Sequence, residues 1–167
     1  MLAHVNQISA ADIERMKKLG MVAAVHPWAV INGGINRTVF ERAAMDMAPL
    51  KTLQASGITW GLGSDGSRAN QILPFQTLSW AVTGRMVGGE VVLREAQRLS
   101  REEALVAHTR RNAYLVFQEK NLGSIEVGKL ADLVVLDRDY LTVPVDQIKD
   151  IRSVTTIVNG RIAYSQP

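Results

Sequence analysis

Short apolar runs and amphipathic stretches alternate along the first part of the chain. The runs at 1–4, 21–25 and 58–64 consist mostly of apolar and small residues. A continuous run without polar alternation is typical of a strand buried on both faces, as in a parallel sheet. Between the first two runs, Ser9 is placed to cap a helix over 10–19. This alternation of buried strand and helix predicts βαβ units around a parallel sheet.

Further helices are predicted around the third run. A long connection follows the second run and leads to a helix over about 40–55, in which Pro49 marks a break. Another helical segment begins near Pro74. The stretch Ser100–Glu103 forms a full capping box and predicts a helix over about 101–118.

The pattern changes towards the C-terminal end of the chain. The segment 123–129 is interpreted as a short strand and turn, and 131–137 is strongly strand-like. Two further apolar stretches flank Asn159-Gly160, which is a strong signal for a tight β-hairpin. The last third of the chain is therefore predicted to form a small β unit.

The length of the chain allows one core plus a small appendage. It has 167 residues, of which 47% are hydrophobic, an ordinary composition for a globular protein. We place a domain boundary near 119–122, where the helical pattern gives way to strands. The predicted domains are therefore 1–120 and 121–167.

Composition and charge exclude several classes of protein. There are no cysteines, so any metal must be bound by His, Asp or Glu. The net charge of +3 is small, and the arginines between 94 and 111 are interspersed with glutamates, which favours a solvated helix face over a nucleic-acid surface. No apolar run approaches the ~20 residues that span a bilayer, and the first residues lack a signal-peptide pattern. We therefore expect a cytoplasmic protein that binds neither nucleic acid nor membrane.

Residues with coordination chemistry stand at the ends of the three predicted strands. Asp65 follows the third run and has small neighbours, Gly63 and Ser64, which leave room for a metal ion or a substrate. Catalytic groups of α/β barrels sit at such strand ends. A strand-end aspartate can equally cap the following turn, so the local sequence leaves both roles open. His4 and His26 end the other two strands, and adjacent strand ends about 4.8 Å apart can direct three side chains to one site.

The individual residues allow competing interpretations. His4 is either a metal ligand or an exposed side chain at a frayed terminus. His26 precedes a proline, which favours an extended turn, so lining a substrate pocket is favoured over ligation. Trp28 follows directly and is expected to face the same pocket. His108 and the other two tryptophans are expected to be structural.

Two motifs resemble those of a known family. The segment 53–67, which contains Gly-Ser-Asp-Gly-Ser, is similar to the last barrel strand of the metal-dependent amidohydrolases. The segment 123–137, which contains Gly-Lys-Leu-Ala-Asp-Leu-Val-Val-Leu-Asp, resembles the superfamily signature where the chain returns to its β-sandwich. The likeness covers essentially the whole chain. It is closest to amidohydrolase family 3, which contains deformylases and N-acyl amino acid deacylases.

The resemblance implies a fold, an activity and a site. The fold would be the last three βα units of a TIM-like (β/α)8 barrel followed by part of a β-sandwich. The activity would be hydrolysis of non-peptide carbon–nitrogen bonds in small amide, formamide or N-acyl substrates by metal-activated water. Asp65 matches the aspartate that binds metal and shuttles the proton, and His4 matches a histidine ligand. The cofactor would be a divalent metal, with zinc expected first.

The chain also departs from the family pattern. His26 stands where the family often has glutamine before proline, and 110–113 departs from the usual Thr-x-Asn-Pro-Ala. The His-x-His pair of the family's first strand and the ligands of its middle strands have no counterpart in this sequence, so the ligand set is incomplete. The alternative hypothesis is therefore a catalytically inactive truncated fragment or pseudoenzyme remnant. It would act only with a partner, or as a homo-oligomer that covers its open sheet edges.

Overall fold

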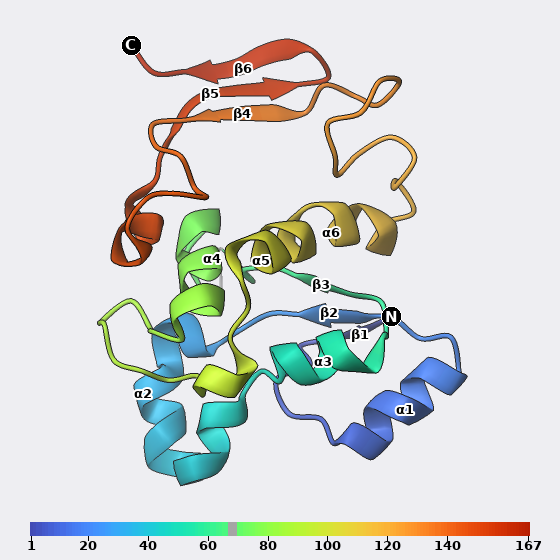
Figure 1. Ribbon diagram of the computed structural model, residues 1–167, viewed down its shortest axis with the longest axis vertical. Coiled ribbons are helices and arrows are strands. Elements are labelled where there is room, and N and C mark those ends of the chain that lie inside the picture. Colours follow the sequence, from blue (N-terminus) through green and yellow to red (C-terminus); the bar gives the residue numbers. More distant parts are fainter. Residues whose placement is uncertain (67–69) are drawn as a thin grey trace.

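The computed structural model describes residues 1–66 and 70–167, which form two three-stranded sheets together with α-helices and short 3-10 helices. The first sheet is parallel and the second is antiparallel, so the predicted α/β class is confirmed. Figure 1 shows helices α5 (Arg101–His108) and α6 (Arg110–Leu115) between the two sheets. Ser67, the last residue of the 53–67 motif, lies outside the described residues.

The parallel sheet brings the three predicted strand ends to one edge. Its strands lie in the order β1 (Leu2–Ala3), β2 (Ala23–Val25) and β3 (Trp60–Leu62). Each strand is shorter than the apolar run that predicted it. Every residue of β2 and β3 is buried, as expected for apolar runs without alternation. The register pairs Val25 with Leu62, so β2 and β3 end level with each other.

Helices connect and cover the strands of this sheet. Helix α1 begins where predicted, because the Ser9 hydroxyl accepts a hydrogen bond from the Asp12 N–H at 3.1 Å. The helical segments before α5 are α1 (Ala10–Lys18), α2 (Ala29–Phe40), the 3-10 helix η1 (Glu41–Asp46), α3 (Leu50–Ser56), α4 (Pro74–Thr83) and the 3-10 helix η2 (Glu95–Gln97).

Three stretches differ from the predicted helices. The connection after β2 is itself helix α2, which packs closely on a distant segment: a Cβ at Gly33 would lie 2.5 Å from Val92 Cγ1. The helix predicted over 40–55 is divided into η1 and α3, and Pro49 is the N-cap residue that directly precedes α3. The helix predicted over 101–118 is divided at Thr109, whose backbone (φ −120°, ψ −83°) is not helical.

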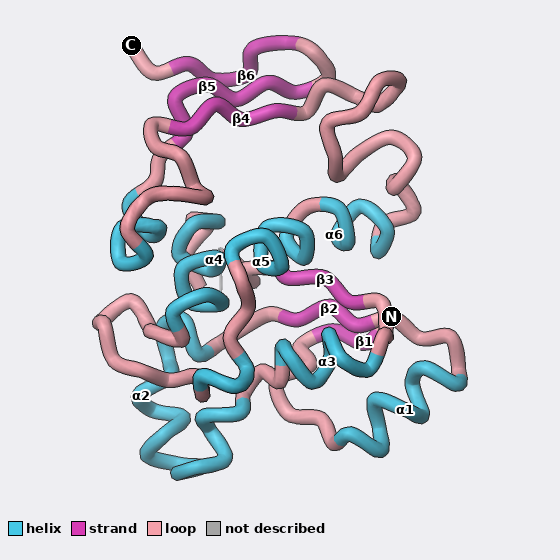
Figure 2. The backbone as a smooth tube through the Cα atoms, viewed as in Figure 1, coloured by secondary structure: helices cyan, strands magenta, loops and turns pink. Residues whose placement is uncertain are grey.

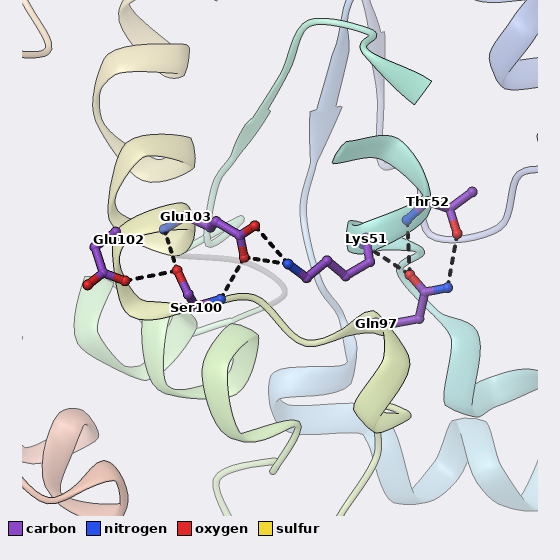
Figure 3. Close-up of polar contacts among 6 residues, drawn as sticks. All are labelled: Lys51, Thr52, Gln97, Ser100, Glu102 and Glu103. Atoms are coloured by element: carbon purple, nitrogen blue, oxygen red, sulfur yellow. Dashed lines mark hydrogen bonds and ion pairs between the residues drawn. The ribbon is translucent and has the colours of Figure 1, made fainter. Parts of the chain in front are cut away.

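A polar network joins the start of α5 to α3 (Figure 3). Ser100 and Glu103 form the predicted capping box, in which each side chain accepts a hydrogen bond from the other's backbone N–H. Lys51 Nζ lies 2.6 Å from Glu103 Oε2, and this pairing is the main cause of the lowered pKa of Glu103. Gln97 accepts from the Lys51 N–H at 3.0 Å and donates to the Thr52 hydroxyl at 3.0 Å. These contacts fix α5 against α3.

Lowering the pH is expected to destabilise the fold through His108. Burial lowers the pKa of His108, and its Nε2 atom has no hydrogen-bond partner among the described residues. Between its ordinary value of 6.5 and the lower folded value, the unfolded chain binds more protons, so the free energy of unfolding falls as the pH falls through this range. Urea unfolding at about pH 7.5 and about pH 5.5 measures this. The variant His108→Gln should show a smaller pH dependence, and an unchanged one would contradict the assignment.

The second sheet is formed by β4 (Leu133–Leu136), β5 (Ser153–Val158) and β6 (Arg161–Ser165). The hairpin between β5 and β6 is confirmed, since Asn159 (φ 49°) and Gly160 (φ 74°) both adopt the left-handed backbone that the tightest hairpin turn requires. The strand predicted within 123–129 is wrong: this segment consists of turns and bends. A second layer facing this sheet is not seen in the described part of the chain, so the β-sandwich stays a prediction.

One hydrophobic core crosses the predicted domain boundary. It contains Trp60 and Trp80, 1% and 0% exposed, which confirms their structural assignment. It also contains Ile148, from the 3-10 helix η3 (Val145–Asp150), so the division near 119–122 stays a prediction. The helices in Figure 2 are short, and within the described residues none has the length and hydrophobicity to cross a bilayer.

Candidate functional site

His4, His26 and Asp65 converge at the carboxyl edge of the parallel sheet. His4 follows β1, His26 follows β2, and Asp65 comes three residues after β3. One donor atom of each lies within 4.8 Å of the others. His4 Nδ1 lies 3.7 Å from Asp65 Oδ2, and the two imidazole centroids are 4.9 Å apart at 78°. The structure therefore brings together three side chains that are separated by up to 61 positions in the sequence.

The backbone at two of these residues is unusual. His4 (φ 58°) and Asp65 (φ 53°) both lie in the left-handed region, which few residues other than glycine adopt. Such conformations cluster at functional sites and cost about 1–3 kcal/mol each. Within the described residues, the turn after β3 is capped by Ser64, whose hydroxyl accepts from the Gly66 N–H at 3.2 Å. Among the described residues, His4 is the charged or ionisable partner of the Asp65 carboxylate, at 3.7 Å.

His26 belongs with the candidate ligands. Burial lowers the pKa of His26, His4 lowers it further, and Asp65 opposes the shift. The imidazole is therefore neutral at pH 7, which is the form that binds metal. Its Nδ1 atom is buried without a hydrogen-bond partner among the described residues. The sequence favoured a pocket-lining role, but position at the end of the middle strand was a signal for ligation as well.

The residues present fit a divalent metal ion. Two imidazoles and one carboxylate are an ordinary donor set for zinc and related ions, and catalytic zinc sites use three protein ligands with one open position. The donor atoms within 4.8 Å of one another would need only a modest contraction to surround an ion at bond lengths of about 2.0–2.2 Å. The Nδ1 atom of His26, which is buried without a hydrogen-bond partner among the described residues, is consistent with a ligand atom.

Replacing Gly63 by alanine is expected to weaken metal binding about tenfold with little loss of stability. A Cβ at position 63 would lie 3.0 Å from His26 Cδ2 and 3.2 Å from its Nε2, so the imidazole would have to shift. Zinc calorimetry together with urea unfolding measures both effects. Gly88→Ala, where a Cβ meets nothing within 4 Å, is the matched control. Equal zinc affinity in wild type and Gly63→Ala would contradict the placement of His26.

Trp28 stands beside the three candidate ligands. It precedes α2, its side chain is 48% exposed, and its ring centroid lies 6.5 Å from that of His4. Both residues line a cavity of about 380 Å³ that also includes Asn36 and Phe40 of α2. The sequence analysis named neither residue as part of a site: Asn36 fell in the predicted connection, and Phe40 at the start of the helix predicted over 40–55.

The sequence profile described as "Amidohydrolase family" matches residues 1–164. The chain is 30% identical over 136 residues to the 5-methylthioadenosine/S-adenosylhomocysteine deaminase of Moorella thermoacetica. This alignment covers 75% of this chain and 31% of that protein. It is 24% identical over 156 residues to the N-substituted formamide deformylase of Arthrobacter pascens. That alignment covers 92% of this chain and 28% of the deformylase. The chain thus spans about a third of the length of these curated relatives.

Solved structures are also similar to this chain. A crystal structure of an uncharacterized metal-dependent hydrolase from Pyrococcus furiosus superposes with a TM-score of 0.68 at 28% identity. The match covers 84% of this chain and 28% of that one. The sequence profile and the structural superposition therefore agree, since both match this chain to hydrolases.

Proposed function

The chain belongs to the amidohydrolase family, and we propose that it forms part of a metal-dependent hydrolase of non-peptide carbon–nitrogen bonds in amide, formamide or N-acyl compounds. The observation that carries the proposal is the convergence of His4, His26 and Asp65, whose donor atoms lie within 4.8 Å of one another. They occupy the carboxyl ends of neighbouring parallel strands, where barrel enzymes keep their catalytic groups.

Each of the three side chains has a role in the proposed reaction. His4 and His26 would hold a divalent ion, with zinc expected first, through neutral imidazole nitrogens, and Asp65 through one carboxylate oxygen. The ion, when bound, polarises the substrate and makes water a better nucleophile near neutral pH. The Asp65 carboxylate accepts the proton of the attacking water and passes it to the leaving nitrogen as the carbon–nitrogen bond breaks.

The fold supports a specific architecture. We propose that β1 to β3 with their helices are three βα units of a TIM-like barrel within 1–120. The antiparallel strands within 121–167 would contribute to a β-sandwich. Two features support this: the strands are parallel in the order β1-β2-β3, and the chain spans about a third of its relatives' length. Further ligands, substrates and partners of a whole protein are part of the same proposal.

The relatives suggest two branches for the substrate. The Moorella relative is a deaminase of methylthioadenosine and adenosylhomocysteine, and the Arthrobacter relative is a deformylase of N-substituted formamides. Both reactions replace a carbon–nitrogen bond with a carbon–oxygen bond, so the same three residues would serve either one. The alternative function is that of a non-catalytic remnant. It is compatible with a chain that spans about a third of its relatives' length.

Zinc calorimetry on this chain tests the proposal. One equivalent of zinc should bind, and His4→Asn should weaken it at least about tenfold, because asparagine tolerates the left-handed backbone but lacks the imidazole. Asp146→Asn, an exposed carboxylate of η3, is the control and should bind like wild type.

Activity assays then separate the alternatives. The zinc-loaded chain would be assayed with N-benzylformamide and with 5′-methylthioadenosine, each with and without a chelator. Chelator-sensitive conversion of either compound supports the hydrolase and names its branch. Zinc binding without conversion of either favours the non-catalytic alternative, and zinc binding unaffected by His4→Asn would remove the site from the proposal.

A further inference from the structure

A cavity adjoins the three candidate ligands and shares His4 with them. It has a volume of about 380 Å³ and lies between the segment after β1 and helix α2. Trp28, at the start of α2, forms part of its wall and stands in edge contact with the His4 imidazole at 78° between the ring planes. A group bound in this cavity would therefore lie directly beside the candidate metal ligands.

The polar part of the cavity wall is made of carboxamides. Asn6, Gln7 and Asn36 all line it. A carboxamide both donates and accepts hydrogen bonds, so three of them together match a partner that does the same. In the described part of the chain, none of the three side-chain amides is hydrogen-bonded to another residue. Their hydrogen-bonding capacity is therefore free for a bound molecule.

The apolar part of the wall suits a flat group. The Trp28 and Phe40 side chains are 48% and 45% exposed, so part of each ring is accessible to a molecule in the cavity. Aromatic faces and edges favour contact with another planar system. Met47, 6% exposed, is another apolar residue of the cavity wall.

The described residues that line the cavity carry no fixed charge: no lysine, arginine, aspartate or glutamate is among them. In the metal-free chain, a carboxylate or ammonium group bound there would lose part of its hydration without gaining a charged partner among the lining residues, which is unfavourable. The wall therefore selects against ionised groups and for neutral ones that can use the carboxamides.

We propose that this cavity binds an uncharged planar group that both donates and accepts hydrogen bonds, such as a carboxamide or a nitrogen heterocycle, and that this group is the recognised part of the substrate. The second half of the statement rests on the proposed function, because it places the reacting bond of the same molecule at His4, His26 and Asp65. On this basis, the part of the substrate that lies in the cavity carries no ionised group.

Three near-isosteric probes test the charge preference: neutral benzamide, anionic benzoate and cationic benzamidine. Binding is followed in the chelator-treated chain by the NMR signal of the Trp28 indole N–H, identified by its loss in Trp28→Phe. Trp60 and Trp80, 1% and 0% exposed, serve as internal references. Benzamide should shift the Trp28 signal with a Kd of about 1–10 mM, as expected for so small a molecule. Benzoate and benzamidine should bind at least about tenfold more weakly.

Variants locate the binding. Asn36→Leu and Phe40→Ala should each weaken benzamide binding at least about fivefold, because they remove a carboxamide and an aromatic wall. Val39→Ala is the matched control on the same helix, since Val39 is 63% exposed and does not line the cavity. Binding of either charged probe as tight as that of benzamide, or equal weakening by the control, would overturn the proposal.

The outcome is separable from that of the zinc experiment. Benzamide binding without any zinc binding would leave the cavity assignment standing and remove the proposed hydrolase. Zinc binding at the three residues without benzamide binding would support the proposed metal site and overturn the cavity assignment.

Discussion

Asp65→Asn is expected to weaken zinc binding at least about 100-fold while leaving the fold intact, and to abolish turnover in any active form of the protein. Asparagine keeps the shape of aspartate but not its charge, so it is a poor ligand for a divalent ion and cannot accept the proton of the attacking water. It also tolerates the left-handed backbone at this position, where φ is 53°. The loss would therefore come from chemistry and not from a distorted turn.

The measurement pairs zinc calorimetry with urea unfolding in the presence of a chelator. Metal-free wild type and Asp65→Asn should unfold within about 0.5 kcal/mol of each other. Asp146→Asn makes the same chemical change on the 3-10 helix η3 and should retain wild-type zinc affinity. Near-normal zinc affinity or activity in Asp65→Asn would refute the role assigned to Asp65.

Gly61→Ala is expected to destabilise the fold by about 3 kcal/mol. A Cβ on this residue of β3 would lie 2.1 Å from Asn112 Oδ1 and 2.8 Å from Leu115 Cδ1. Asn112 cannot move away freely, because its Nδ2 donates to the Leu62 carbonyl at 2.8 Å and to the His108 carbonyl at 3.1 Å. The substitution therefore forces both overpacking and the loss of hydrogen bonds where β3 meets α6.

Urea unfolding measures this cost. Gly88→Ala is the control, since a Cβ there meets open space, and it should change stability by less than about 0.5 kcal/mol. Adding Asn112→Ala to Gly61→Ala should remove part of the clash, so the two effects should be less than additive. Additive effects, or a Gly61→Ala variant as stable as wild type, would show that β3 and α6 do not meet as closely as described.

The contact between Gly61 and Asn112 also gives a physical meaning to a sequence detail. The stretch 110–113 departs from the Thr-x-Asn-Pro-Ala pattern of the family that the chain resembles, yet it keeps the asparagine. The side chain of Asn112 bonds to the carbonyl of Leu62, the last residue of β3 and three positions before Asp65. Asn112 therefore helps to hold the strand end that carries the candidate ligand.

Local signals predicted several elements correctly. The cap at Ser9, the capping box at Ser100 and the hairpin at Asn159-Gly160 depend on contacts within about four residues, so the sequence states them directly. The apolar runs before His4, His26 and Asp65 likewise predicted strands with polar ends. The errors came where contacts between distant residues determine the local structure. Gly33 of α2, for example, lies against Val92, and no local sequence pattern contains this contact.

What the sequence alone determined is therefore the α/β class, the positions of the strands, the likeness to amidohydrolases, and the candidacy of His4, His26, Asp65 and Trp28. Only the tertiary structure decided that His26 lies with the other two candidate ligands, and that Asn36 and Phe40 form a cavity beside them. The reason is physical: capping, hairpin turns and hydrophobic periodicity act over a few neighbouring residues. A shared site depends on the pairing of strands 20 to 60 residues apart, and on the helix packing that sets which side chains meet.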